Sequence, residues 1–110
     1  MEECIFCKIA AGEIPSRKVH HEDNTIVSFL DIDQKVQGHT LVIPVEHYHW
    51  FYDMPDEESN RFFRAARHIA KELKEEYKAD YIQLSILGAD VPHVHIHLLP
   101  RFLKDKPPKI

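Results

Sequence analysis

An α+β domain is predicted for this chain, with an antiparallel sheet of about five strands, one long helix and a short N-terminal helix. Short segments rich in β-branched and aromatic residues lie on both sides of one long stretch with helical periodicity, and neighbouring segments are joined by short connections. The chain has 110 residues, of which 44% are hydrophobic, enough for one core and too few for two. We therefore predict one domain over residues 1–103, followed by a C-terminal tail at 104–110.

The first predicted elements are a short helix and a short strand. Within residues 1–12 the apolar side chains recur at helical spacing, and Gly12 is a natural helix end. Pro15 biases the residue before it away from the helical region, which predicts an extended link. Residues 19–21 are expected to form a short strand before an Asx-type turn at 22–24.

Two strands and the long helix follow. Residues 25–31 are rich in β-branched and aromatic side chains, and residues 40–44 form an apolar run that stops at a proline. Pro55 and the acidic residues after it predict a helix that runs to about residue 78. Its apolar stripe is interpreted as core or as a dimer face. The stripe consists of Phe62, Phe63, Ala66, Ile69, Ala70, Leu73 and Tyr77.

Three histidines alternate with apolar residues in the last predicted strand, at 93–99. A strand at 81–87 precedes it, and the short connection between them predicts antiparallel pairing. Because a strand turns successive side chains to opposite faces, the three imidazoles are expected on one face, about 6.6 Å apart. Such a row can supply a nucleophile, a proton shuttle, a phosphate donor or a metal ligand. The structural alternative is a polar strand face or a fortuitous metal site.

The cysteines indicate a metal site near the N-terminus. Cys4 and Cys7 are the two cysteines of the chain, and their Cys-x-x-Cys spacing is that of a zinc half-site or of a redox pair. A redox pair is expected beside a βαβ pattern, which this part of the sequence lacks. Zinc needs two further ligands, and the chain contains nine histidines from which to draw them.

Composition and charge exclude several classes of partner. The formal net charge is −4, so the chain lacks the basic footprint of a protein that grips nucleic acid. No run of eighteen apolar residues predicts a membrane span, and the N-terminal residues lack the order of a signal peptide. These features predict a soluble, cytoplasmic protein. A small phosphorylated ligand is compatible with them.

The motifs appear in the order found in the histidine triad (HIT) family, which the chain resembles from residue 4 to residue 102. They are CIFCKI at 4–9, GEIPS at 12–16, FLDI at 29–32, GHTLVIP at 38–44 and VPHVHIHLLPR at 91–101. The resemblance implies an α+β homodimer that binds a purine nucleotide such as AMP or GMP. It also implies hydrolysis of nucleoside phosphoramidates or dinucleoside polyphosphates by way of a nucleotidyl-histidine.

The resemblance also implies roles for individual residues. His95 becomes the nucleophile, while His97 and His39 bind the phosphate or orient the His95 ring. Asp31 accepts hydrogen bonds from the ribose. Independently of the resemblance, the oriented backbone amides of the Gly88 turn can serve as phosphate donors. The apolar residues implied for the base pocket are Ile5, Phe6, Ile9, Phe29 and Ile32.

A structural Zn²⁺ is implied in the same way. Its ligands are Cys4, Cys7, His93 and His47, and His49 is the rival of His47. Two thiolates and two imidazoles suit a tetrahedral zinc.

The loop before the triad departs from the family pattern. It is short, with Ala89 where many relatives have Gln and Asp90 where they have Ser. A carboxylate aimed at a phosphate opposes binding, so Asp90 either points away or signals a different substrate. The leading hypothesis is thus a hydrolase or nucleotidyl transferase. The alternatives are a purine-nucleotide-binding or sensing module with little turnover, and a zinc-stabilised interaction domain, against which the presence of His39 and Asp31 argues.

Overall fold

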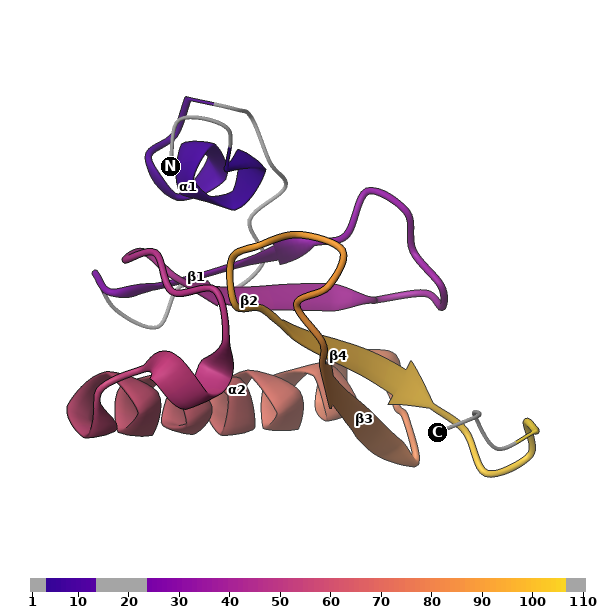
Figure 1. The fold of residues 1–110 in the computed structure, drawn as a ribbon. Helices are drawn as coiled ribbons and strands as arrows, with labels where there is room; N and C mark the ends of the chain where they lie inside the picture. Colours follow the sequence, from indigo (N-terminus) through magenta and orange to yellow (C-terminus); the bar gives the residue numbers. More distant parts are fainter. Residues whose placement is uncertain (1–3, 14–23, 107–110) are drawn as a thin grey trace.

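The computed structural model describes residues 4–13 and 24–106, in which a four-stranded antiparallel sheet separates two helices (Figure 1). The α+β prediction is confirmed, with four strands in these residues where about five were expected. The predicted strand at 19–21 lies outside the described residues. The strands are β1 (Ile26–Leu30), β2 (Thr40–Pro44), β3 (Tyr81–Ile86) and β4 (Ile96–Arg101), and the helices are α1 (Ile5–Ala10), α2 (Asp56–Tyr77) and the short 3₁₀ helix η1 (Phe51–Asp53).

The two helices cover opposite faces of the sheet, whose strand order is β1-β2-β4-β3 (Figure 1). Alternation along β2 assigns the faces: Val42 packs in the cluster with α2, whereas Leu41 and Ile43 pack in the cluster with α1. The predicted antiparallel pairing of the last two strands is confirmed, with Ser85 opposite His97 and Leu41 on the other side of His97. His97 therefore sits in the middle of the face that α1 covers.

Helix α2 supplies five of the eleven buried residues in the core cluster on its side of the sheet. It begins after Pro55 with three acidic residues in its first turn and ends at Lys78, whose φ of 53° is left-handed. The stripe residues Phe62, Ala66, Ile69 and Leu73 are all completely buried. Because they are buried within this chain, the stripe is core, and the dimer-face interpretation of these four side chains is wrong.

Strand β4 begins three residues later than predicted, at Ile96 in place of His93. The reason is in the neighbouring strand, where Pro44 has no N–H to donate to a continued ladder. The chain from His93 to Val94 bonds locally instead: the His93 amide donates to the Val91 carbonyl (2.8 Å) and the Val94 amide to the Tyr48 carbonyl (2.6 Å). The histidine segment thus enters the sheet from a bend, which changes the direction of its first ring.

The even spacing expected for the three imidazoles is correspondingly wrong. All three rings lie on the α1 side, because His93 and His95 both meet the ring of Phe6 and His97 meets His95. The ring centroids of His95 and His97 are 4.8 Å apart. The His93 ring turns toward the cysteines instead, 3.2 Å from the sulfur of Cys4.

Neither helix in residues 4–13 and 24–106 has the length and apolar character needed to span a membrane.

Candidate active site and metal centre

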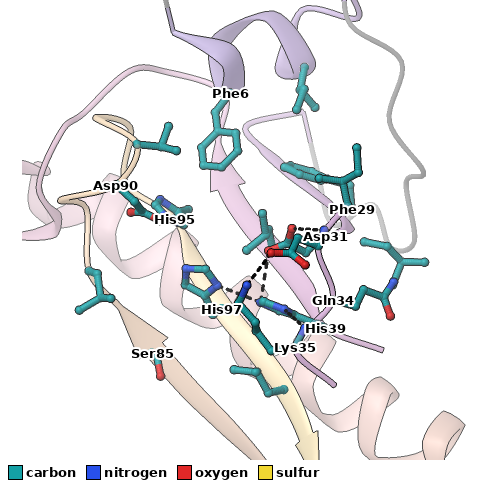
Figure 2. A pocket seen from close by; sticks show the side chains of 18 of the residues that line it. Phe6, Phe29, Asp31, Gln34, Lys35, His39, Ser85, Asp90, His95 and His97 are labelled. Carbon is teal, nitrogen blue, oxygen red and sulfur yellow. Dashed lines mark hydrogen bonds and ion pairs between the residues drawn. The ribbon is translucent and has the colours of Figure 1, made fainter. Parts of the chain in front are cut away.

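A cavity of about 830 Å³ lies between α1 and the sheet and draws side chains from all four strands. Figure 2 shows His95 and His97 at its centre, with Phe6, Phe29 and Asp31 on one side of them and Asp90 on the other. Predicted residues that line it are Ile5, Phe6, Ile9, Phe29, Asp31, Ile32, His39, His95 and His97. Gly88 is not among the lining residues, although its neighbours Leu87 and Asp90 are.

His95 is held so that one ring nitrogen is free to react. The ring is 1% exposed, and its Nδ1 lies 2.8 Å from the carbonyl oxygen of His93. A carbonyl only accepts, so Nδ1 carries the proton and donates. In the neutral ring Nε2 then keeps its lone pair, which is the form required of a nucleophile.

His39 and His97 form a relay whose tautomers follow from their hydrogen bonds. The amide of Lys35 donates to Nδ1 of His39 (3.2 Å), so the proton of a neutral His39 is on Nε2. That Nε2–H donates to Nδ1 of His97 (2.9 Å), which leaves the His97 proton on its own Nε2. Burial lowers the pKa of His39, and it lowers that of His97 to about 4, so both rings are neutral near pH 7. His97 therefore presents an N–H donor to the cavity.

Asp31 both caps a turn and faces the cavity. Its Oδ1 accepts from the Asp33 amide at 2.9 Å, and its Oδ2 lies 3.5 Å from Nε2 of His39. The Asp31 side chain is 18% exposed, which leaves part of the carboxylate open to a ligand. Lys35 binds Asp33 at 2.6 Å, so its charge is already paired.

Beside Asp31 the cavity becomes an aromatic slot. The rings of Phe6 and Phe29 meet edge to face with centroids 5.8 Å apart, and Phe6 also meets the His95 ring at 4.9 Å. Such apolar walls beside one carboxylate suit a flat ring that carries hydroxyl groups. Ile32 lines the slot from its rim with a fully exposed side chain.

Cys4, Cys7, His47 and His93 form a second cluster, in which the four candidate ligand atoms all lie within 4.8 Å of one another. The sulfur of Cys7 is 3.1 Å from Nδ1 of His47 and 3.4 Å from Nδ1 of His93. Zinc ligands at tetrahedral angles stand about 3.5 Å apart when the Zn–S and Zn–N bonds have their usual lengths. The cluster therefore fits Zn²⁺ with little adjustment.

The surroundings of the cluster favour metal ligation. His93 donates its Nε2–H to the Pro44 carbonyl (2.9 Å), so the lone pair of Nδ1 faces the sulfurs. Burial, and then the hydrogen bond and charge of Cys4, raise the pKa of Cys7 to about 11, so the pair needs a cation to hold two thiolates. The rival His49 lies elsewhere: its Nε2 is 3.1 Å from the Gly88 carbonyl and its ring stacks on Trp50.

Two residues of β3 and the residue that follows it also belong to the site, although they were not among the predicted site residues. Gln83, Ser85 and Leu87 line the cavity, and their spacing of two is the signal from which they were predictable. Asp90 does not point away from the site, because its Oδ1 lies 3.6 Å from Nε2 of His95. The carboxylate is thus the charged neighbour of the candidate nucleophile.

Comparison with known proteins identifies the family. The family profile described as "HIT domain" matches residues 11–104. This chain belongs to the HIT family. It is 44% identical to "Protein hit" of Bacillus subtilis over 110 residues, covering 94% of this chain and 74% of the relative. It is 41% identical to adenosine 5'-monophosphoramidase HNT1 of Saccharomyces cerevisiae over 103 residues, covering 89% of this chain and 62% of that enzyme.

Solved structures of HIT proteins match the fold closely. SMU.412c from Streptococcus mutans superposes with a TM-score of 0.91 at 40% identity, covering 100% of this HIT chain and 73% of the other. A zinc-bound histidine triad family protein from Mycobacterium smegmatis superposes with a TM-score of 0.86 at 32% identity, covering 96% and 79%. The likeness confirms the predicted family and fold.

Proposed function

We propose that this HIT protein is a hydrolase or nucleotidyl transferase that acts on purine nucleoside phosphoramidates or dinucleoside polyphosphates through a nucleotidyl-histidine at His95. The observation that carries the proposal is the hydrogen bond from His95 Nδ1 to the His93 carbonyl, which in the neutral ring leaves the Nε2 lone pair at the cavity. The adenosine 5'-monophosphoramidases among the relatives support it, since their names describe cleavage of a phosphorus–nitrogen bond.

Two displacements at phosphorus make up the reaction on a phosphoramidate. In the first, the lone pair of His95 Nε2 forms a bond to the α-phosphorus, and the P–N bond breaks. Its electron pair stays on the departing nitrogen, which takes a proton from water. In the second, water forms a bond to phosphorus and gives its proton to solvent, while the bond to Nε2 breaks and AMP leaves. Splitting one difficult displacement into two easier ones is the advantage of covalent catalysis.

The surrounding side chains assist both displacements. The His95 ring is cationic while it holds the nucleotidyl group, and the His93 carbonyl that accepts its Nδ1–H stabilises that charge. The neutral relay from His39 to His97 directs an N–H at a phosphate oxygen. Losing such a positioned group usually slows a reaction by about 10²–10⁴. We infer that His39→Ala falls in that range.

The nucleoside occupies the slot on the β1 side of His95. A purine fits between the apolar walls, with Phe6 and Phe29 as its aromatic contacts, and Asp31 accepts hydrogen bonds from the ribose hydroxyls. AMP and GMP are both compatible with these contacts.

A structural Zn²⁺ held by Cys4, Cys7, His47 and His93 completes the proposal. When bound, the ion neutralises the two thiolates and contributes folding free energy. Cys4 is also the N-cap of α1, where its sulfur accepts from the Cys7 amide at 3.3 Å. The same residues therefore fix the helix that carries Phe6 over the site.

Single-turnover labelling tests the function. Protein in excess over AMP phosphoramidate is quenched in alkaline denaturant, because phosphorus–nitrogen bonds to histidine hydrolyse in acid, and the adenylated peptide is mapped by mass spectrometry. We expect adenylate on His95 in the wild type and neither label nor turnover in His95→Ala. AMP binding by that variant should be nearly unchanged, since Phe29 and Asp31 remain.

His68→Ala is the matched control, because His68 is exposed on α2 on the opposite face of the sheet. It should keep both label and turnover. Full turnover by His95→Ala, or an adenylate on a different residue, would remove the nucleophile assignment. A wild-type protein that binds AMP without any turnover would favour the sensing module instead.

A further inference from the structure

The carboxylate beside the nucleophile is the feature of this cavity that the general reaction does not use. Asp90 lies in the connection between β3 and β4, with its Oδ1 3.6 Å from His95 Nε2 and its side chain 59% exposed. Partial burial raises its pKa, but hydrogen bonds from the amides of Val91 and of Asp90 itself hold the pKa below its usual value. Asp90 is therefore an anion near pH 7 and a poor proton donor. It acts on the reaction through its charge.

The loop that carries Asp90 is held by contacts that are distant in sequence. Gly88, two residues before it, has φ +116°, and a Cβ there would come within 3.0 Å of the Trp50 ring. The ring of His49 stacks on that of Trp50, and its Nε2–H donates to the Gly88 carbonyl at 3.1 Å. This packing fixes the backbone of the loop two residues before Asp90.

The cavity extends on both sides of His95, and its two ends differ in chemistry. On the β1 side lie Phe29 and Asp31, which the proposed function assigns to the nucleoside. Asp90 lies on the opposite side of His95, as Figure 2 shows. Because the substrate is split at phosphorus, the part that is not the nucleotide extends toward this second end. Its lining residues from β3 and the loop are Ser85, Leu87, Asp90 and Val91.

The charge at this second end is not neutralised by the residues that line it. Lys35, the lysine among the lining residues, is paired with Asp33 beside the nucleoside end. A leaving group with a positive charge is attracted by Asp90 as it approaches His95, and one with a negative charge is repelled. The partial exposure of Asp90 screens both effects without abolishing them.

We propose that Asp90 selects the leaving group, favouring phosphoramidates of cationic amines over those of anionic amines and over dinucleoside polyphosphates. This inference rests on the proposed function and narrows it to one substrate class. Screened ion pairs change an equilibrium by up to about fivefold per unit charge. Going from one positive to one negative charge changes the leaving group by two unit charges and should therefore lower kcat/KM by up to about 25-fold.

Three AMP phosphoramidates that differ mainly in charge provide the test. Their amines are ethylenediamine, whose free end is cationic, propylamine, which is neutral, and β-alanine, which is anionic. We expect kcat/KM of the wild type to fall in that order. In Asp90→Asn the three values should converge, and in Asp90→Lys the order should reverse. Glu57→Gln removes an exposed carboxylate on α2, on the other face of the sheet, and should leave the order unchanged.

The outcomes separate the inference from the function on which it rests. Turnover of all three compounds with no charge preference in the wild type, or a preference that Asp90→Asn retains, would overturn the selection by Asp90 and leave the hydrolase intact. Failure of the wild type to cleave any of the three would overturn the proposed function and this inference together. Reversal of the order by Asp90→Lys cannot arise from a purely structural role.

Discussion

Gly38→Ala should destabilise this protein more than an alanine at a comparable glycine, because the site combines backbone strain with a steric clash. Gly38 has φ +86°, and a Cβ there would lie 2.8 Å from two ring atoms of Tyr77 and 3.1 Å from Cγ of Pro100. Gly12 has nearly the same φ, +82°, but no atom of residues 4–13 and 24–106 lies within 4 Å of its Cβ position. The two substitutions thus share the strain and differ in the clash.

The magnitudes follow from these two contributions. A left-handed conformation costs an L-residue about 1–2 kcal/mol, which is the whole expected effect of Gly12→Ala. Forcing a methyl group into a packed region adds about 1–3 kcal/mol, so Gly38→Ala should lose about 2–5 kcal/mol. Each kcal/mol lowers the Tm of a domain of this size by about 4 °C. The clash should therefore separate the two variants by about 4–12 °C.

Urea denaturation of both glycine variants measures the difference, and a double-mutant cycle identifies its cause. Tyr77→Ala removes the ring, so Gly38→Ala should cost less in that background. Activity provides a second readout, because Gly38 immediately precedes His39 and its amide donates to Gln34 Oε1 at 3.1 Å. Equal losses for Gly12→Ala and Gly38→Ala, or a penalty that Tyr77→Ala does not reduce, would refute the reasoning.

Three further measurements test the zinc, the buried relay and the assembly. Elemental analysis of protein purified without chelators should find one zinc per chain. The Cys7→Ser variant should lose the metal and unfold at a lower temperature. Wild-type protein without metal would contradict the zinc site. Burial lowers the pKa of His97 from 6.5 to about 4, so on acidification the unfolded state binds a proton before the folded state does. The free energy of unfolding should therefore fall as the pH drops from 6.5 to about 4. His97→Asn should reduce the slope of the free energy of unfolding against pH in this interval. Sedimentation at micromolar concentration should detect a homodimer. Leu84 is 48% exposed on the edge strand β3, so Leu84→Lys should weaken the dimer. A 12.9 kDa species alone would exclude the homodimer.

The pattern of apolar and polar residues along the chain was sufficient to predict the helices and strands whose conformation depends on their own residues. Helix α2 was predicted at about 55–78 and spans Asp56–Tyr77, and the strand predicted at 40–44 spans Thr40–Pro44. The alternation of histidines with apolar residues predicted a strand from residue 93, and this start is wrong because the hydrogen-bonded ladder ends where the partner strand β2 stops pairing. Pro44 prevents further pairing, and its carbonyl accepts from the His93 ring at 2.9 Å.

The parts of the site that depend on loop packing were beyond the reach of sequence pattern. His47 and His49 are equivalent by spacing, and the choice between them is made by Trp50, whose ring stacks on His49 at 4.0 Å. The same ring lies against Gly88, two residues before Asp90, whose carboxylate lies 3.6 Å from His95 Nε2. Contacts between residues 38 positions apart, such as Trp50 and Gly88, leave no periodic trace in a single sequence.

His93 connects the candidate metal centre to the candidate nucleophile. This connection explains why His93 and His95 stand two residues apart although both precede strand β4. The His93 ring faces Cys4 and Cys7, while the carbonyl of the same residue accepts from His95 Nδ1 at 2.8 Å. A second connection runs through Phe6, which α1 carries onto both rings. A change that frees the His93 ring should therefore alter the orientation of His95, because the carbonyl that holds His95 Nδ1 belongs to the same residue. For this reason we expect the cysteine cluster to influence kcat, although none of its four side chains lines the cavity.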